Sequence, residues 1–159
     1  MDSFTAPFPT PNPAWDDASP GFSVIGLENT PGKKAFLIHL EAKPGKEDLV
    51  AGFLRDINDG VNQEPGTGPW FAWRFSKTTF GVFEAFSDDK RRLDHVHGPG
   101  GNNFLRSELL KEMLAWPAQV YRLDVLHGKF DVLFGKPVTT AGAVDEEASL
   151  GASAHHERL

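Results

Sequence analysis

The chain has 159 residues, which is enough for one domain with a sizeable core and too few for two ordinary domains. Its 16 basic and 22 acidic residues give a net charge of −6, and the longest basic run is Lys90 to Arg92, which argues against nucleic-acid binding. Because cysteine is absent, disulfide scaffolds, thiol catalysis and iron–sulfur clusters are excluded. No stretch has the character of a signal segment or a bilayer span, so we expect a cytoplasmic protein without membrane contact.

Two terminal regions differ in composition from the rest of the chain. Residues 1–33 hold six of the twelve prolines, which predicts an extended N-terminal arm without a regular helix or a central strand. The arm carries more apolar residues than a solvated linker, so we expect part of it to pack on the body or on a partner subunit. Residues 130–159 are predicted to be a C-terminal extension that ends in an acidic, flexible tail.

The first half of the folded domain, predicted at residues 34–129, has a clear periodicity. Residues 35–42 alternate in polarity as a strand does, and apolar residues at helical spacing over 49–61 predict an amphipathic helix. Residues 70–75 and 79–86 are rich in aromatic side chains. The short connection between these two stretches predicts an antiparallel hairpin.

The second half of the domain is predicted to contain two helical segments and a final strand. Ser87 is placed to cap a helix that reaches about His97, where the glycine-rich residues 98–101 break it. A further helical segment follows at 103–114, and the last strand at 119–126. The order of elements predicts an α+β fold of the ferredoxin-like split βαβ type, with a four-stranded antiparallel sheet and its helices on one face.

The face of the sheet without helices is predicted to be the dimer interface. It would carry aromatic side chains from the hairpin together with His39 and Glu41, and such a face is too apolar to remain in water. A second copy of the chain is the simplest cover. We therefore expect a homodimer that pairs through its sheets as a dimeric α+β barrel.

The segment from Lys34 to about His127 resembles the antibiotic biosynthesis monooxygenase, or quinol monooxygenase-like, family of the dimeric α+β barrel superfamily. The resemblance is carried by the stretches AFLIHLEAKPGKEDLVAGFL, EPGTGPWFAWRF and TTFGVFEAFSDDKRRLDHVHGP. It implies a homodimer and, in the enzymatic members, cofactor-free oxygenation of a phenol, quinol or anthrone. In that chemistry the substrate itself supplies electrons to dioxygen. The protein needs a group that holds the substrate as an anion and an apolar cavity that excludes water.

Three histidines are candidates for the site. The resemblance places His95 at the helical histidine of the family and makes it the candidate general base, although a cap or packing role at the helix end is the alternative. His39 is the second catalytic candidate, with a structural hydrogen bond as its alternative. His97 falls where other members have a small polar residue, and it is a candidate for substrate binding. We expect no metal, because two histidines two residues apart on a helix differ by roughly 200° in direction.

Four further residues are candidates for substrate binding. Trp70, Trp73 and Phe83 are suited to stacking on a flat aromatic ligand, although aromatic residues on strands also form cores and dimer interfaces. Arg74 is suited to binding a substrate anion, and a structural ion pair with Glu84 is its alternative.

These features predict a cofactor-independent monooxygenase that oxidises a polycyclic phenol, quinol or anthrone-type molecule with dioxygen, in secondary metabolism. Two alternatives remain open. The same scaffold could serve a non-oxidative cyclase, isomerase or decarboxylase, or it could be a non-catalytic ligand-binding module. Fold does not choose among them, because function depends on the site.

Overall fold

A computed structural model describes residues 19–26 and 30–129 of the protein. Most of the predicted arm and the predicted C-terminal extension at 130–159 lie outside these residues. In chain order the elements are β1 (Phe22–Ile25), β2 (Lys34–Glu41), α1 (Glu47–Val61), β3 (Trp70–Arg74), β4 (Thr79–Phe86), α2 (Asp89–Val96), the 3-10 helix η1 (Gly101–Leu105), α3 (Ser107–Met113) and β5 (Ala118–Asp124).

The described part of the chain has an α+β fold with a mixed five-stranded sheet in the order β1-β5-β2-β4-β3. The pairings of β5 with β2, β2 with β4 and β4 with β3 are antiparallel. The sheet nevertheless differs from the prediction, because β1 adds a fifth strand that runs parallel to β5, with Phe22 opposite Ala118. Residues 22–25 contain no proline, and they pair only at the sheet edge. The prolines of the arm therefore do not interrupt the ladder.

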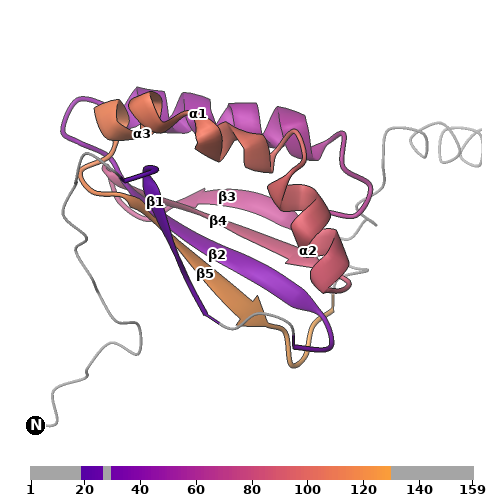
Figure 1. Ribbon diagram of the computed structural model, residues 1–159. Coiled ribbons are helices and arrows are strands. Elements are labelled where there is room, and N and C mark those ends of the chain that lie inside the picture. Colours follow the sequence, from indigo (N-terminus) through magenta and orange to yellow (C-terminus); the bar gives the residue numbers. More distant parts are fainter. Residues whose placement is uncertain (1–18, 27–29, 130–159) are drawn as a thin grey trace, which may run out of the picture.

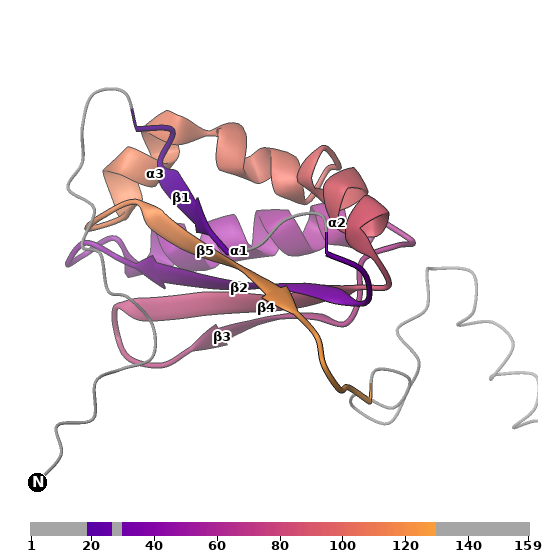
Figure 2. The ribbon, with the colours of Figure 1, turned by 60° about the horizontal axis from the view of Figure 1, so that its bottom comes forward.

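The helices α1, α2 and α3 cover one face of the sheet (Figure 1). A view from a second direction shows the same arrangement, with no described helix on the opposite face (Figure 2). Within residues 19–26 and 30–129, no helix is both long and apolar enough to cross a membrane.

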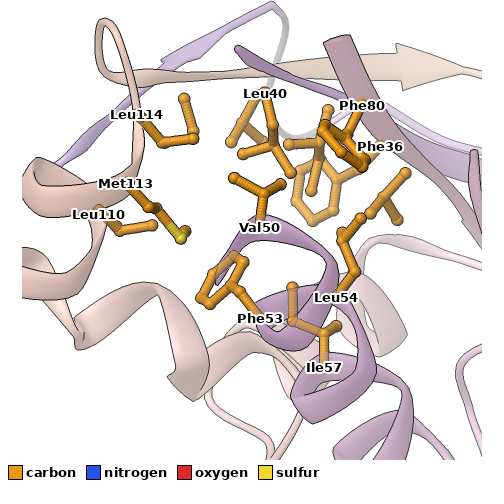
Figure 3. Packing of buried hydrophobic residues seen from close by; sticks show 14 of the residues in the cluster. Phe36, Leu40, Val50, Phe53, Leu54, Ile57, Phe80, Leu110, Met113 and Leu114 are labelled. Atoms are coloured by element: carbon orange, nitrogen blue, oxygen red, sulfur yellow. The ribbon is translucent and has the colours of Figure 1, made fainter. Parts of the chain in front are cut away.

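A single apolar core joins α1 and α3 to the sheet (Figure 3). Its members include Val50, Phe53, Leu54 and Ile57 of α1, Leu110 and Met113 of α3, and Phe36, Leu40 and Phe80 of the sheet. Burial of each large apolar side chain contributes roughly 1.5–3 kcal/mol relative to exposure. This packing fixes α1 and α3 on one face of the sheet. The neighbouring part of the same face is covered by α2.

Two local details differ from the sequence prediction. The N-cap of α2 is Asp88 rather than Ser87, because Asp88 has the extended backbone of a cap and its carboxylate accepts a hydrogen bond from the Arg91 N–H at 2.8 Å. The helical segment predicted at 103–114 is divided into η1 and α3. It divides because Arg106, with φ −81° and ψ 61°, leaves helical geometry.

Candidate active site

One row of side chains crosses the helix-covered face of the sheet. Trp70, Glu84, Phe36 and Arg122 lie opposite one another on β3, β4, β2 and β5, and residues paired in this way project to the same face. The guanidinium of Arg92, on α2, lies 5.6 Å from the centre of the Phe36 ring. Glu84 is therefore buried between the sheet and α2, with only 1% of its surface exposed.

His95 of α2 lies between two carboxylates. Its Nδ1 is 2.6 Å from Glu64 Oε2, and its Nε2 is 3.1 Å from Glu84 Oε1. Burial alone would lower the pKa of His95, but hydrogen bonds to both carboxylates and their negative charges raise it to about 9. At neutral pH His95 is thus an imidazolium with both N–H groups engaged, which leaves neither nitrogen free to accept a proton.

Glu64, in the loop between α1 and β3, is held in place by two further contacts. Its carboxylate accepts hydrogen bonds from the Thr67 hydroxyl at 2.7 Å and from the Gly100 N–H at 2.7 Å. Burial raises the pKa of Glu64, but the hydrogen bonds from His95 and Thr67 outweigh it, and the pKa lies below its usual value. Gly100 permits this approach, because a Cβ there would lie 2.7 Å from Val61 and 3.2 Å from His95.

A cavity of about 310 Å³ opens beside this cluster, between α2, η1 and strands of the sheet. Its polar lining includes Glu84, Arg92 and His95, all of them buried. Its apolar lining includes four exposed side chains, Val24, Leu93, Val96 and Leu105. The cavity therefore combines buried charged groups with an apolar entrance.

Two buried polar atoms, which belong to residues that line the cavity, have no hydrogen-bond partner in the described part of the chain. They are Oε2 of Glu84 and Nη1 of Arg92. The other terminal nitrogen of Arg92, Nη2, pairs with Asp89 in the first turn of α2. Buried polar groups in proteins are nearly always paired, so these two atoms beside the cavity are exceptions.

His39 lies on the opposite face of the sheet from His95. It belongs to the row Gln119, His39, Gly81 and Trp73, which alternates with the row that contains Glu84. Burial lowers the pKa of His39, and the charge of Glu41 only partly opposes this effect. The two predicted catalytic histidines therefore do not converge on one site within this subunit.

No family model and no curated protein matches the chain. Among solved structures, NE2512, a protein of unknown function from Nitrosomonas europaea, is 35% identical with a TM-score of 0.56, and the match covers 62% of this chain and 94% of NE2512. The chain belongs to the family of NE2512.

Two more distant structures share the fold of this NE2512 family member. One is a candidate antibiotic biosynthesis monooxygenase from Nitrosomonas europaea, 15% identical with a TM-score of 0.54 over 65% of this chain and 99% of that one. The other is a candidate antibiotic biosynthesis monooxygenase from Caulobacter crescentus, 18% identical with a TM-score of 0.52 over 61% and 92%. The predicted resemblance to the antibiotic biosynthesis monooxygenases is therefore confirmed as a likeness of fold.

The structure distributes the predicted site residues of this NE2512 family member among several places. Of these residues, only His95 lines the cavity. Trp70 lies beside Glu84 in the ladder, and Arg74 lies farther along β3 with its guanidinium 4.5 Å from the centre of the Phe80 ring.

The remaining predicted residues lie away from the cavity. Trp73 and Phe83 are on the open face with His39, where the Phe83 and Phe71 ring centres are 5.5 Å apart. His97 is exposed at the C-cap of α2.

Sequence reasoning did not identify Glu84, Glu64 and Arg92 as site residues. Glu84 was considered only as an ion-pair partner for Arg74, although a carboxylate within the apolar stretch FGVFEAF is a signal in its own right. Glu64 belongs to the EPGT phrase that carried the resemblance. Arg92 carries no sequence signal that separates it from its basic neighbours, because its burial depends on the rotation of α2.

Proposed function

We propose that this member of the NE2512 family is a cofactor-independent monooxygenase that oxidises a phenol, quinol or anthrone-type molecule in the cavity beneath α2. The observation that carries the proposal is Glu84, a buried carboxylate in the lining of a mainly apolar cavity, whose Oε2 has no hydrogen-bond partner among the described residues. A carboxylate in that position is suited to accept a proton from a substrate hydroxyl, and the apolar walls exclude water.

The proposed reaction begins with transfer of the hydroxyl proton to the Glu84 carboxylate. The resulting phenolate is electron-rich and gives electrons to dioxygen without a cofactor. For an anthrone, both C–H bonds of the ring methylene are broken, and their electrons reduce dioxygen. One oxygen atom becomes the new carbonyl, and the other leaves as water with the two hydrogens.

His95 is assigned a positioning role in this proposal, in place of the general-base role predicted from the sequence. Its Nε2–H donates to Glu84 Oε1, which fixes the carboxylate. Its positive charge also offsets the negative charge that the substrate acquires. Glu64 holds the imidazolium from the other side.

A second copy of the chain is proposed to cover the open face of the sheet. That face carries the half-buried side chains of Leu37, His39, Trp73 and Phe83, a largely apolar group on a surface without a described helix. His39 would then lie at the dimer interface. The absence of cysteine fits the cytoplasm as the compartment.

Oxygen uptake by the metal-stripped protein, assayed against anthrones, naphthols and quinols, tests the proposed function. We expect uptake to survive chelation and to fall about 100-fold or more in Glu84→Gln, because a general base typically contributes roughly 10²–10⁴-fold. The matched control is Glu108→Gln, since Glu108 has a highly exposed side chain on α3. Absence of uptake with every compound, by a protein that light scattering shows to be a folded dimer, would refute the proposal.

The same carboxylate also suits a non-oxidative isomerase or cyclase, in which Glu84 moves a proton and dioxygen takes no part. An anaerobic assay separates the two functions. Only the monooxygenase loses turnover when dioxygen is removed.

A further inference from the structure

We propose that residues 1–18, the N-terminal segment, dock on the apolar surface around the cavity entrance of their own subunit. The aromatic side chains of the segment are the anchors. The surface, called the entrance patch, consists of Val24, Leu93, Val96 and Leu105. This inference goes beyond the proposed function, because it concerns what covers the cavity and not the reaction inside it.

The entrance patch gathers most of the exposed large apolar side chains of the described residues. Seven such side chains are exposed, and four of them form the patch. They come from β1, α2 and η1, so three separate elements present apolar groups at one place. Leu93 and Leu105 are 57% and 74% exposed. Large apolar side chains that are grouped in this way on a surface mark a binding site for a partner.

The described chain begins beside the entrance patch. Phe22 lines the same cavity, and its ring meets that of Phe104 edge-on with the ring centres 5.7 Å apart. Phe104 directly precedes Leu105, and it also packs on Phe53 of the core, with ring centres 5.4 Å apart. Trp15 comes seven residues before Phe22, and seven residues of extended chain span roughly 23–25 Å. Trp15 is therefore within reach of the patch of its own subunit.

The composition of the N-terminal segment suits docking on an apolar surface. Residues 1–18 contain three aromatic residues and four prolines, and they contain neither lysine nor arginine. Aromatic side chains are the usual anchors of an interface. Each proline fixes one backbone angle, so the segment loses less conformational freedom on docking. The covalent connection to β1 also raises the effective concentration of the anchors at the patch.

Two other occupants fit the position of the patch less well. Residues 130–159 follow the end of β5, whereas Phe22 lies opposite Ala118 at the start of that strand. A second copy of the chain is assigned to the open face of the sheet, and the patch borders the helix-covered face. The N-terminal segment is thus the occupant that the course of the chain favours.

Docking would make the N-terminal segment a cover for the cavity. The side chains that it contacts are the ones that a ligand passes on its way in. A ligand and the docked segment therefore compete for the same apolar groups.

Hydroxyl-radical labelling of the 159-residue protein, measured residue by residue with mass spectrometry, tests the inference. The labelling rates of Leu93 and Leu105 are compared with those in the variant Phe4→Ser/Phe8→Ser/Trp15→Ser. We expect both rates to rise at least about threefold in the variant, because tethered anchors keep the patch covered in most molecules of the unmodified protein. Equal rates in the two proteins would overturn the inference.

Internal references separate loss of the cover from general loosening of the fold. Phe75 and Leu126 are 82% and 85% exposed and lie outside the cavity lining, so their labelling should be the same in both proteins. Leu110 has no exposed surface and should stay unlabelled. A rise at Leu93 and Leu105 that is matched at all three references would count against the inference.

A matched variant of the C-terminal residues tests the first rival occupant. Phe130→Ser/Val132→Ser/Phe134→Ser also removes three apolar side chains, and it should leave the labelling of Leu93 and Leu105 unchanged. A rise in this variant alone would overturn the inference in favour of residues 130–159.

Dilution of the unmodified protein tests the second rival occupant. A segment of the same chain protects Leu93 and Leu105 equally at every protein concentration. Protection that is lost on dilution would show that a second copy covers the patch, and it would overturn the inference. No substrate or dioxygen enters these measurements, so their outcome is independent of the outcome for the proposed function.

Discussion

The two faces of the sheet hold histidines whose pKa values move in opposite directions. On the helix-covered face, the hydrogen bonds that His95 donates to Glu64 and Glu84 overcome the effect of burial and raise the pKa of His95 to about 9. On the open face, burial lowers the pKa of His39, since Glu41 offers only a weaker, opposing charge. Burial acts in the same direction on both residues. The difference therefore shows that paired carboxylates, rather than depth, decide which histidine is a cation.

The largest expected difference between the faces is in stability. His95→Ala should lower the free energy of unfolding by about 3–5 kcal/mol, because it leaves two carboxylates buried without their cation. His39 has no salt-bridge partner among the described residues, so His39→Ala leaves no buried charge unpaired. It should cost about 1 kcal/mol. Urea unfolding of both variants at pH 7 measures the difference. Equal losses would show that the carboxylate cluster contributes nothing beyond packing.

The contrast between the two faces also shows which features of the sheet could be predicted from the sequence. The alternation of residues 35–42 correctly placed Phe36 and His39 on different faces, and strand periodicity likewise separates Trp70 from Trp73, which are three residues apart. The predicted site nevertheless combined residues of both faces. Alternation fixes which side chains share a face, but it does not say on which face the cavity lies.

The cluster itself was only partly accessible to sequence reasoning. His95 was identified from a family resemblance that included the EPGT phrase, yet the role of Glu64 depends on a loop folding back against α2, which no periodicity describes. The fifth strand was missed for a related reason. Its four residues form a short edge strand whose pairing with β5 is a tertiary contact between distant segments.

The two histidines should give opposite pH dependences of stability. The pKa of His95 is raised from 6.5 in the unfolded chain to about 9, so its contribution is complete below pH 6.5 and is lost as the pH rises toward 9, by up to about 3 kcal/mol. The pKa of His39 is lowered, so its protonation penalises the folded state only as the pH falls below 6.5.

Denaturant titrations from pH 5 to 9.5 separate the two contributions. His95→Gln should remove the decline above pH 6.5, while His39→Gln should change only the acidic side. A decline between pH 6.5 and 9 that is unchanged in His95→Gln would contradict a protonated His95 in the folded protein.

A smaller loss of stability is expected from a substitution of Gly100, whose contacts to Glu64 and His95 lie on the helix-covered face of the sheet. In Gly100→Ala the new Cβ would lie 2.7 Å from a Val61 methyl and 3.0 Å from the Glu64 carboxylate, so the loop must shift away from the cluster. Overpacking of this kind costs about 1–3 kcal/mol, and the shift should also lengthen the Gly100 N–H contact to Glu64. The pKa of His95, followed by NMR titration, should fall as its partner loosens.

Gly52 in α1 provides the matched control, because a Cβ there meets nothing closer than 3.6 Å. Gly52→Ala should stabilise the protein by about 0.4–1 kcal/mol through lower entropy of the unfolded chain, and it should leave the pKa of His95 unchanged. The pair of variants thus separates a general effect of adding a methyl group from a specific effect on the cluster. If Gly100→Ala lowers stability without moving the pKa of His95, the glycine serves packing against Val61 and not the alignment of Glu64.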